Sequence, residues 1–120
     1  MKRPNALEHF RGEQCYNCAQ AVLKTYSSSA GFDDVCLERF SHFGSGRAPD
    51  GECGALFAAK AILQDATAKQ KVEEDFVRAA GSSKCREIRK GRLFTCDQCV
   101  QAAADAVFVR LTEGHVLTRP

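Results

Sequence analysis

The chain has 120 residues, of which 44% are hydrophobic and 27% charged, and its formal net charge is +2 at pH 7. These values are typical of one ordinary globular domain, and the net charge is too mild to imply a nucleic-acid partner. The start is basic but lacks the apolar run of a signal peptide, and no stretch is apolar enough for membrane insertion. We therefore expect a cytoplasmic protein, in which thiols stay reduced.

Apolar residues recur at helical spacing along most of the chain, and no alternating apolar and polar run predicts a strand. A polar leader over residues 1–12, with a short helical turn around Leu7 and Phe10, precedes the first firm helix. Thr95 and Gln98 fit a capping box at the start of the last long helix, and residues 113–120 after it are expected to fray. Short polar connections favour an all-α, single-domain bundle of about five helices over residues 13–112. The predicted helices cover residues 13–26, 35–43, 52–65, 68–80, 84–90 and 96–111.

The helix predicted at residues 52–65 is almost uncharged, so we expect it to be central and buried on nearly all sides. A glycine-rich loop precedes it. Because proline cannot sit inside a helix, the helix should begin after Pro49, with Asp50 or Gly51 as its N-cap. Cys53 then falls in the first turn, where unpaired backbone N–H groups and the helix dipole favour a thiolate. Packing as a small buried hydrophobe is the competing interpretation of this cysteine.

Seven cysteines are many for a cytosolic domain, and their odd number argues against a closed disulfide framework. Cys15 and Cys18 stand three residues apart in the first predicted helix, so they are expected to share a face. Cys96 and Cys99 have the same spacing in the last helix, and Cys36 lies on the flank of the second. The spacing does not fit a zinc ribbon, a thioredoxin unit or a c-type haem site. A helical bundle can nevertheless bring thiolates together, which would suit zinc or an iron–sulfur cluster.

Four segments carry most of this cysteine pattern: NCAQAV at 17–22, GECGALFA at 51–58, SSKCREI at 82–88 and CVQAA at 99–103. Together they resemble a family of small proteins suspected of redox activity and named for their C-GCAxxG-C-C pattern, read here as a CGAxxG motif. The resemblance covers about residues 13–110. The chain departs from the motif at Ala58, which stands where the motif ends in glycine. The resemblance implies that the marked thiols are Cys18, Cys53, Cys85 and Cys99, and it leaves Cys15, Cys36 and Cys96 as additions.

The favoured hypothesis is a redox-active protein whose four marked thiols converge to bind an iron–sulfur cluster, or less favourably zinc, for electron transfer. Cys53 and Cys85 support it, because both are predicted in the first turn of a helix, where a thiolate is stabilised. The alternative has no cofactor and is a thiol–disulfide protein with Cys53 as the low-pKa nucleophile. Its resolving thiol would be Cys18, Cys85 or Cys99, with Cys15 or Cys96 as a spare.

A third hypothesis is a non-redox bundle that handles metal ions or binds another protein. His42 is a weaker candidate for a ligand or base, and Arg47 for holding an anion or a thiolate. The sequence identifies no redox partner, and a homodimer is compatible with it.

Overall fold

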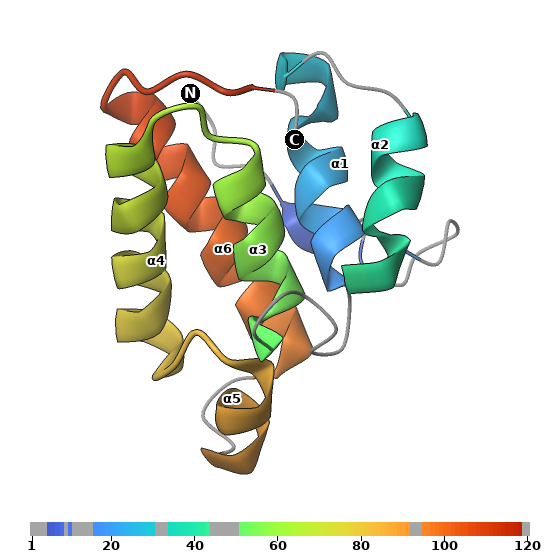
Figure 1. Cartoon of the computed structure of the whole chain (residues 1–120), viewed down its shortest axis with the longest axis vertical. Coiled ribbons are helices and arrows are strands. Elements are labelled where there is room, and N and C mark those ends of the chain that lie inside the picture. Colours follow the sequence, from blue (N-terminus) through green and yellow to red (C-terminus); the bar gives the residue numbers. More distant parts are fainter. Residues whose placement is uncertain are drawn as a thin grey trace.

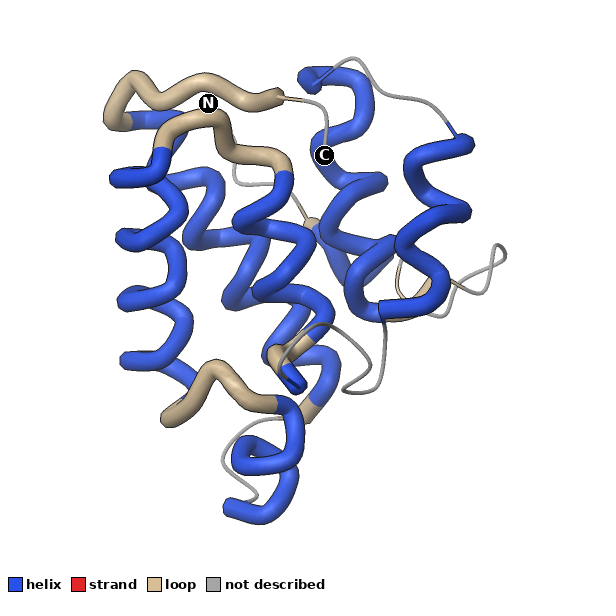
Figure 2. The backbone as a smooth tube through the Cα atoms, viewed as in Figure 1, coloured by secondary structure: helices blue, strands red, loops and turns tan. Residues whose placement is uncertain are grey.

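The structure is a computed structural model, which describes residues 5–8, 10, 16–30, 34–43, 51–91 and 95–118. Within these residues it has six α-helices and two short 3-10 helices, and no β-strand (Figure 1; Figure 2). This confirms the all-α fold: the bundle of about five helices has six, one for each of the six predicted ranges. The elements are η1 (Ala6–Glu8), α1 (Cys18–Ala30), α2 (Asp34–Arg39), η2 (Phe40–Phe43), α3 (Gly54–Ala61), α4 (Ala66–Ala80), α5 (Cys85–Gly91) and α6 (Cys96–Thr112).

The predicted central helix, α3, contacts α1, α4 and α6 and lies between α1 and α4 in Figure 1. Its small side chains let the neighbouring helices approach closely. Ala58, which replaces the last glycine of the motif, is fully buried, so the core accommodates its methyl group. No helix in the described part of the chain is both long and apolar enough to cross a membrane. The buried residues of α3 are Gly54, Ala55, Leu56, Ala58 and Ala59.

Asn17 determines where α1 begins. Its Oδ1 accepts a hydrogen bond from the backbone N–H of Gln20 at 2.8 Å, and Gln20 Oε1 accepts one from the backbone N–H of Asn17 at 3.0 Å. This reciprocal arrangement is a capping box with asparagine as the cap. The helix therefore begins at Cys18 and not at residue 13 as predicted, and Cys15 lies outside the described residues. The helix also continues to Ala30, beyond the predicted end at residue 26.

Side-chain caps define the ends of the later helices. Asp65 accepts a hydrogen bond from the backbone N–H of Thr67 at 3.1 Å, so α4 begins at Ala66, slightly earlier than predicted. Gly81 ends α4 with a φ of 91°, a left-handed conformation that favours glycine. The capping box at the start of α6 is confirmed, because Thr95 and Gln98 make both of its hydrogen bonds.

The start of α3 differs from the prediction. Cys53 itself is the N-cap residue, with φ −57° and ψ 128°, in place of Asp50 or Gly51. Residues 44–50, which include most of the glycine-rich loop, lie outside the described part of the chain. Cys53 therefore lies at the boundary of the helix, and its backbone does not have the helical conformation.

Backbone hydrogen bonds join residues 113–118, the described part of the expected tail, to the rest of the chain. The backbone N–H of Gln64 donates to Val116 at 3.2 Å, and that of Thr118 donates to Ile62 at 2.7 Å. Leu63 and Leu117 form an isolated bridge between the same two segments. The segment after α6 is thereby fastened to the connection between α3 and α4.

Candidate thiol site

Four helix starts carry a cysteine. Cys18, Cys85 and Cys96 are the first residues of α1, α5 and α6, and Cys53 is the N-cap of α3. Cys99 completes the first turn of α6, and its backbone N–H makes the hydrogen bond to Thr95 that opens this helix, at 3.0 Å. The starts of α3, α5 and α6 lie together at the lower end of the molecule in Figure 1. The positive ends of the α3 and α6 dipoles thus face a region rich in thiols.

A short backbone pairing joins the segments that carry Cys53 and Cys85. Glu52 and Lys84, the residues directly before these cysteines, form an isolated antiparallel bridge. The backbone N–H of Cys53 donates to the carbonyl oxygen of Ser83 at 2.8 Å. Two cysteines far apart in the sequence are therefore positioned by one small element of structure.

Cys53 and Cys99 form the centre of the site. Both are buried, with exposed fractions of 4% and 5%, and their side chains lie close enough for hydrogen bonding between them to shift the pKa of each. The bond from Cys53 lowers the pKa of Cys99, although burial and neighbouring thiols oppose this. The pKa of Cys53 is raised by the same hydrogen bond and by burial, which outweigh the backbone N–H groups of Leu56 and Ala55. Cys99 thus ionises first while Cys53 keeps its proton, the reverse of the pKa expected for Cys53 from its helix start.

Cys18, Cys85 and Cys96 lie around this pair. Negative charge on each of them raises the pKa of Cys99, with Cys96 acting most strongly. All three are thiols with partly exposed side chains. Cys18, Cys85 and Cys96 are thus near enough to Cys99 for their charges to act on it, and Cys96 is a thiol that the resemblance left aside.

These thiols do not form a metal centre as they are placed. Among the described residues, no group of three or more His, Cys, Asp or Glu side chains could hold a metal ion. The iron–sulfur or zinc centre of the favoured hypothesis is therefore not confirmed by the described residues. Cys15, Arg47 and the side chain of Cys36 lie outside the described part of the chain, and His42 is exposed in η2.

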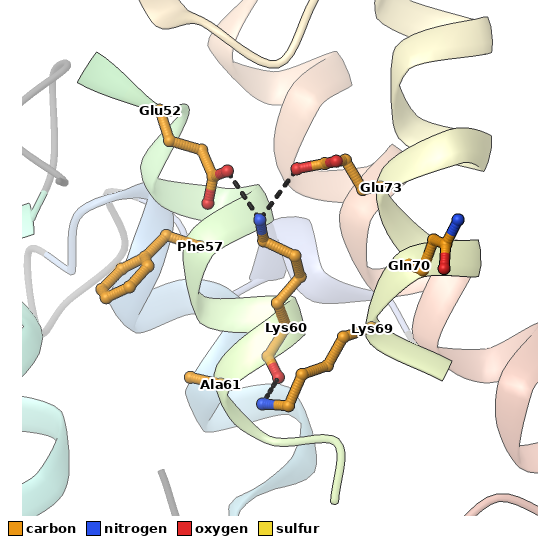
Figure 3. A pocket seen from close by; sticks show the side chains of 7 residues that line it. All are labelled: Glu52, Phe57, Lys60, Ala61, Lys69, Gln70 and Glu73. Atoms are coloured by element: carbon orange, nitrogen blue, oxygen red, sulfur yellow. Dashed lines mark hydrogen bonds and ion pairs between the residues drawn. The ribbon is translucent and has the colours of Figure 1, made fainter. Parts of the chain in front are cut away.

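Lys60 joins two carboxylates close to the start of α3 (Figure 3). Its Nζ donates to Glu52 Oε2 at 2.7 Å and to Glu73 Oε1 at 2.9 Å. Burial disfavours the charged form of Lys60, but these bonds outweigh it and its pKa is raised. The three residues tie the segment before Cys53 to α4. They line a pocket of about 460 Å³ that also includes Phe57, Ala61, Lys69 and Gln70.

Sequence reasoning missed this network, although one signal was present. Lys60 is the only charged residue inside an otherwise apolar helix. A charged side chain on a buried helix requires partners of opposite charge. The sequence therefore indicates that the ammonium group of Lys60 is bonded to carboxylates. Their identity could not be derived, because Glu73 lies on a different helix.

The fold and the site define a small all-helical protein whose thiols gather at helix starts. The model of the family described as "Putative redox-active protein (C_GCAxxG_C_C)" matches residues 16–108, so the chain belongs to this family, as the resemblance indicated. No curated protein and no solved structure matches the chain.

Proposed function

We propose that the protein is a thiol–disulfide redox protein in which Cys53 and Cys99 are the working pair. The observation that supports this most strongly is that two buried thiols from different helices lie close enough to shift each other's pKa. The lowered pKa of Cys99 favours the thiolate that exchange requires. This assignment keeps two of the four marked cysteines. The thiol with the lowered pKa is Cys99, whereas the sequence predicted a low pKa for Cys53.

Oxidation of the pair joins Cys53 Sγ to Cys99 Sγ and releases two protons and two electrons. A disulfide R–S–S–R takes up both and becomes two R–SH molecules. The new S–S bond is about 2.05 Å long, so the two sulfurs must come closer together than they are in the dithiol form. Cys53 can make this approach because it is an N-cap residue, outside the regular helix. The N–H groups of Leu56 and Ala55 stabilise the negative charge that Cys53 carries during the step.

Disulfide mapping tests this function. The whole chain is equilibrated in glutathione buffers of graded ratio, remaining thiols are alkylated, and linked peptides are identified by mass spectrometry. We expect a Cys53–Cys99 linkage in the wild-type chain and in the control Cys85→Ser, and none in Cys99→Ser. Failure of the wild-type chain to form this linkage at any glutathione ratio would overturn the proposal.

An iron–sulfur cluster, or zinc, is the second candidate. It is favoured by the five described thiols in one region, but the described residues offer no set of three ligands, so they do not fit such a centre as placed. The test is anaerobic purification with metal analysis and a visible spectrum. Iron with inorganic sulfide that disappears in Cys18→Ser and Cys85→Ser would replace the first proposal. A chain without iron, zinc or visible absorption would contradict the second.

The setting of this activity is also proposed. In the cytoplasm, where thiols stay reduced, a redox partner would return the pair to the dithiol form after each oxidation. We propose neither a nucleic-acid partner nor membrane insertion, and a homodimer stays compatible with the site. A chain that forms no disulfide and holds no metal would favour the non-redox, metal-handling or interaction bundle.

A further inference from the structure

The two cysteines of the proposed pair are difficult to reach. Cys53 and Cys99 expose only 4% and 5% of their surface. Thiol–disulfide exchange requires the attacking sulfur to approach the sulfur of the substrate directly. A disulfide from solution therefore needs a more accessible thiol at which to react first.

Cys96 has the position that this task requires. It is the first residue of α6 and is partly exposed, between the exposed residues Thr95 and Asp97. It precedes Cys99 by three residues on the same helix. The geometry of an α-helix separates two such Cα atoms by about 5 Å. This lies within the range of about 4.4–6.8 Å that a disulfide spans.

Cys18 and Cys85 are weaker candidates for the same task. Both are partly exposed and lie near Cys99, but each begins a different helix. No regular spacing within one element fixes either of them at disulfide distance from Cys99. The capping box of α6, in contrast, fixes the turn that holds both Cys96 and Cys99.

We propose that Cys96 is the catalytic thiol that reacts with an external disulfide and passes the oxidation inward to the Cys53–Cys99 pair; this rests on the function proposed above. With glutathione disulfide as the substrate, the Cys96 thiolate attacks one sulfur, a mixed disulfide forms and one glutathione thiolate leaves. Cys99 then attacks Cys96 Sγ, and the second glutathione thiolate leaves. Cys53 gives up its proton and attacks Cys99 Sγ, which restores the Cys96 thiolate. The two protons lost by Cys53 and Cys99 end on the two glutathione molecules.

The rate of oxidation reports on the entry thiol Cys96, whereas the equilibrium of oxidation reports on the Cys53–Cys99 pair. In Cys96→Ser, we expect oxidation of the Cys53–Cys99 pair by glutathione disulfide to slow at least about tenfold, because the accessible thiol is lost. The glutathione ratio at which the pair is half oxidised should not change. The matched control is Cys85→Ser, which also replaces a partly exposed first residue of a helix and should oxidise at the wild-type rate. Circular dichroism checks that each variant is folded.

A trapping experiment provides an independent readout. In Cys99→Ser the second step cannot occur, so glutathione should accumulate on Cys96, where peptide mapping will locate it. Oxidation of Cys96→Ser at the wild-type rate, or an adduct in Cys99→Ser on a cysteine other than Cys96, overturns the inference and leaves the Cys53–Cys99 pair intact. Absence of the Cys53–Cys99 disulfide from the wild-type chain overturns the proposed function itself.

Discussion

At the scale of single residues, the thiol pair behaves differently from a lone cysteine at a helix start. The start of α3 supplies N–H groups that lower the pKa of Cys53, but its bond to Cys99 and its burial act more strongly in the opposite direction. The pKa of Cys99 is lowered because its sulfur accepts a hydrogen bond from Cys53. A donor next to a thiol can therefore decide which of two sulfurs carries the charge.

Replacing the donor tests this relation. In Cys53→Ala we expect Cys99 to ionise at higher pH than in the wild-type chain, since burial remains and the hydrogen bond is gone. In Cys53→Ser the hydroxyl group can still donate, so the midpoint should lie between the other two. Timed alkylation with iodoacetamide at graded pH, followed by peptide mapping of Cys99, gives the three midpoints. Equal midpoints in all three chains would show that Cys53 does not control the ionisation of Cys99.

At the scale of elements, α1 and α6 begin with the same order of residues: a cap, a cysteine, any residue and a glutamine. Asn17 and Gln20 form the box of α1, and Thr95 and Gln98 form that of α6. Asn17 has a further task, because its Nδ2 donates to the carbonyl oxygens of Phe40 at 3.3 Å and of Ser41 at 3.0 Å. The first box therefore also joins α1 to η2.

Removing the two caps should consequently have unequal effects. Thr95→Ala is expected to lower the free energy of unfolding by about 1 kcal/mol, the usual cost of a lost N-cap. Asn17→Ala should lower it by about 2 kcal/mol, because two more carbonyl groups lose their donor. Urea unfolding followed by circular dichroism measures both. Gln98→Ala is the control, because it removes only the side chain that accepts the hydrogen bond from the backbone N–H of Thr95. A cost for Asn17→Ala no larger than that for Thr95→Ala would contradict the linking task of Asn17.

The elements also show what the sequence could predict. The start of α6 was predicted because threonine and glutamine at this spacing are a local signal. The equivalent box of α1 was missed because the apolar spacing continues upstream of Asn17. The start of α3 at Cys53 depends on the backbone bond to Ser83, and the order of Val116 to Thr118 depends on bonds to residues 62–64. Pairings between distant segments produce no periodic pattern in the sequence, so they could not be predicted from it. The interaction between Cys53 and Cys99 could not be predicted for the same reason.

At the scale of the whole molecule, two buried groups resist ionisation. Tyr26 of α1 donates its hydroxyl to the carbonyl oxygen of Ala104 in α6 at 2.6 Å. Its pKa is raised by burial and by the negative charge of Asp105, and that of Cys53 is raised by the bond to Cys99 and by burial. In the unfolded chain these groups ionise near their ordinary values, about 8.5 for cysteine and about 10 for tyrosine. The folded chain keeps both protons at a pH where the unfolded chain releases them.

Alkaline pH should therefore destabilise the fold in two steps. A group whose pKa is higher in the folded chain stabilises it fully below its unfolded pKa, and this stabilisation is lost as pH rises. Each group then lowers the free energy of unfolding by up to about 1.4 kcal/mol per pH unit, first from about pH 8.5 and again from about pH 10. Urea unfolding at graded pH under reducing conditions measures the decline.

Two variants assign the steps of this decline. Tyr26→Phe should lose about 1 kcal/mol at neutral pH with its hydrogen bond, but its decline above about pH 10 should be shallower than that of the wild-type chain. Cys53→Ser should remove the earlier part of the decline, because serine does not ionise in this range. If Tyr26→Phe loses stability above about pH 10 as steeply as the wild-type chain, the hydroxyl between α1 and α6 is not what limits alkaline stability, and another group must release its proton on unfolding.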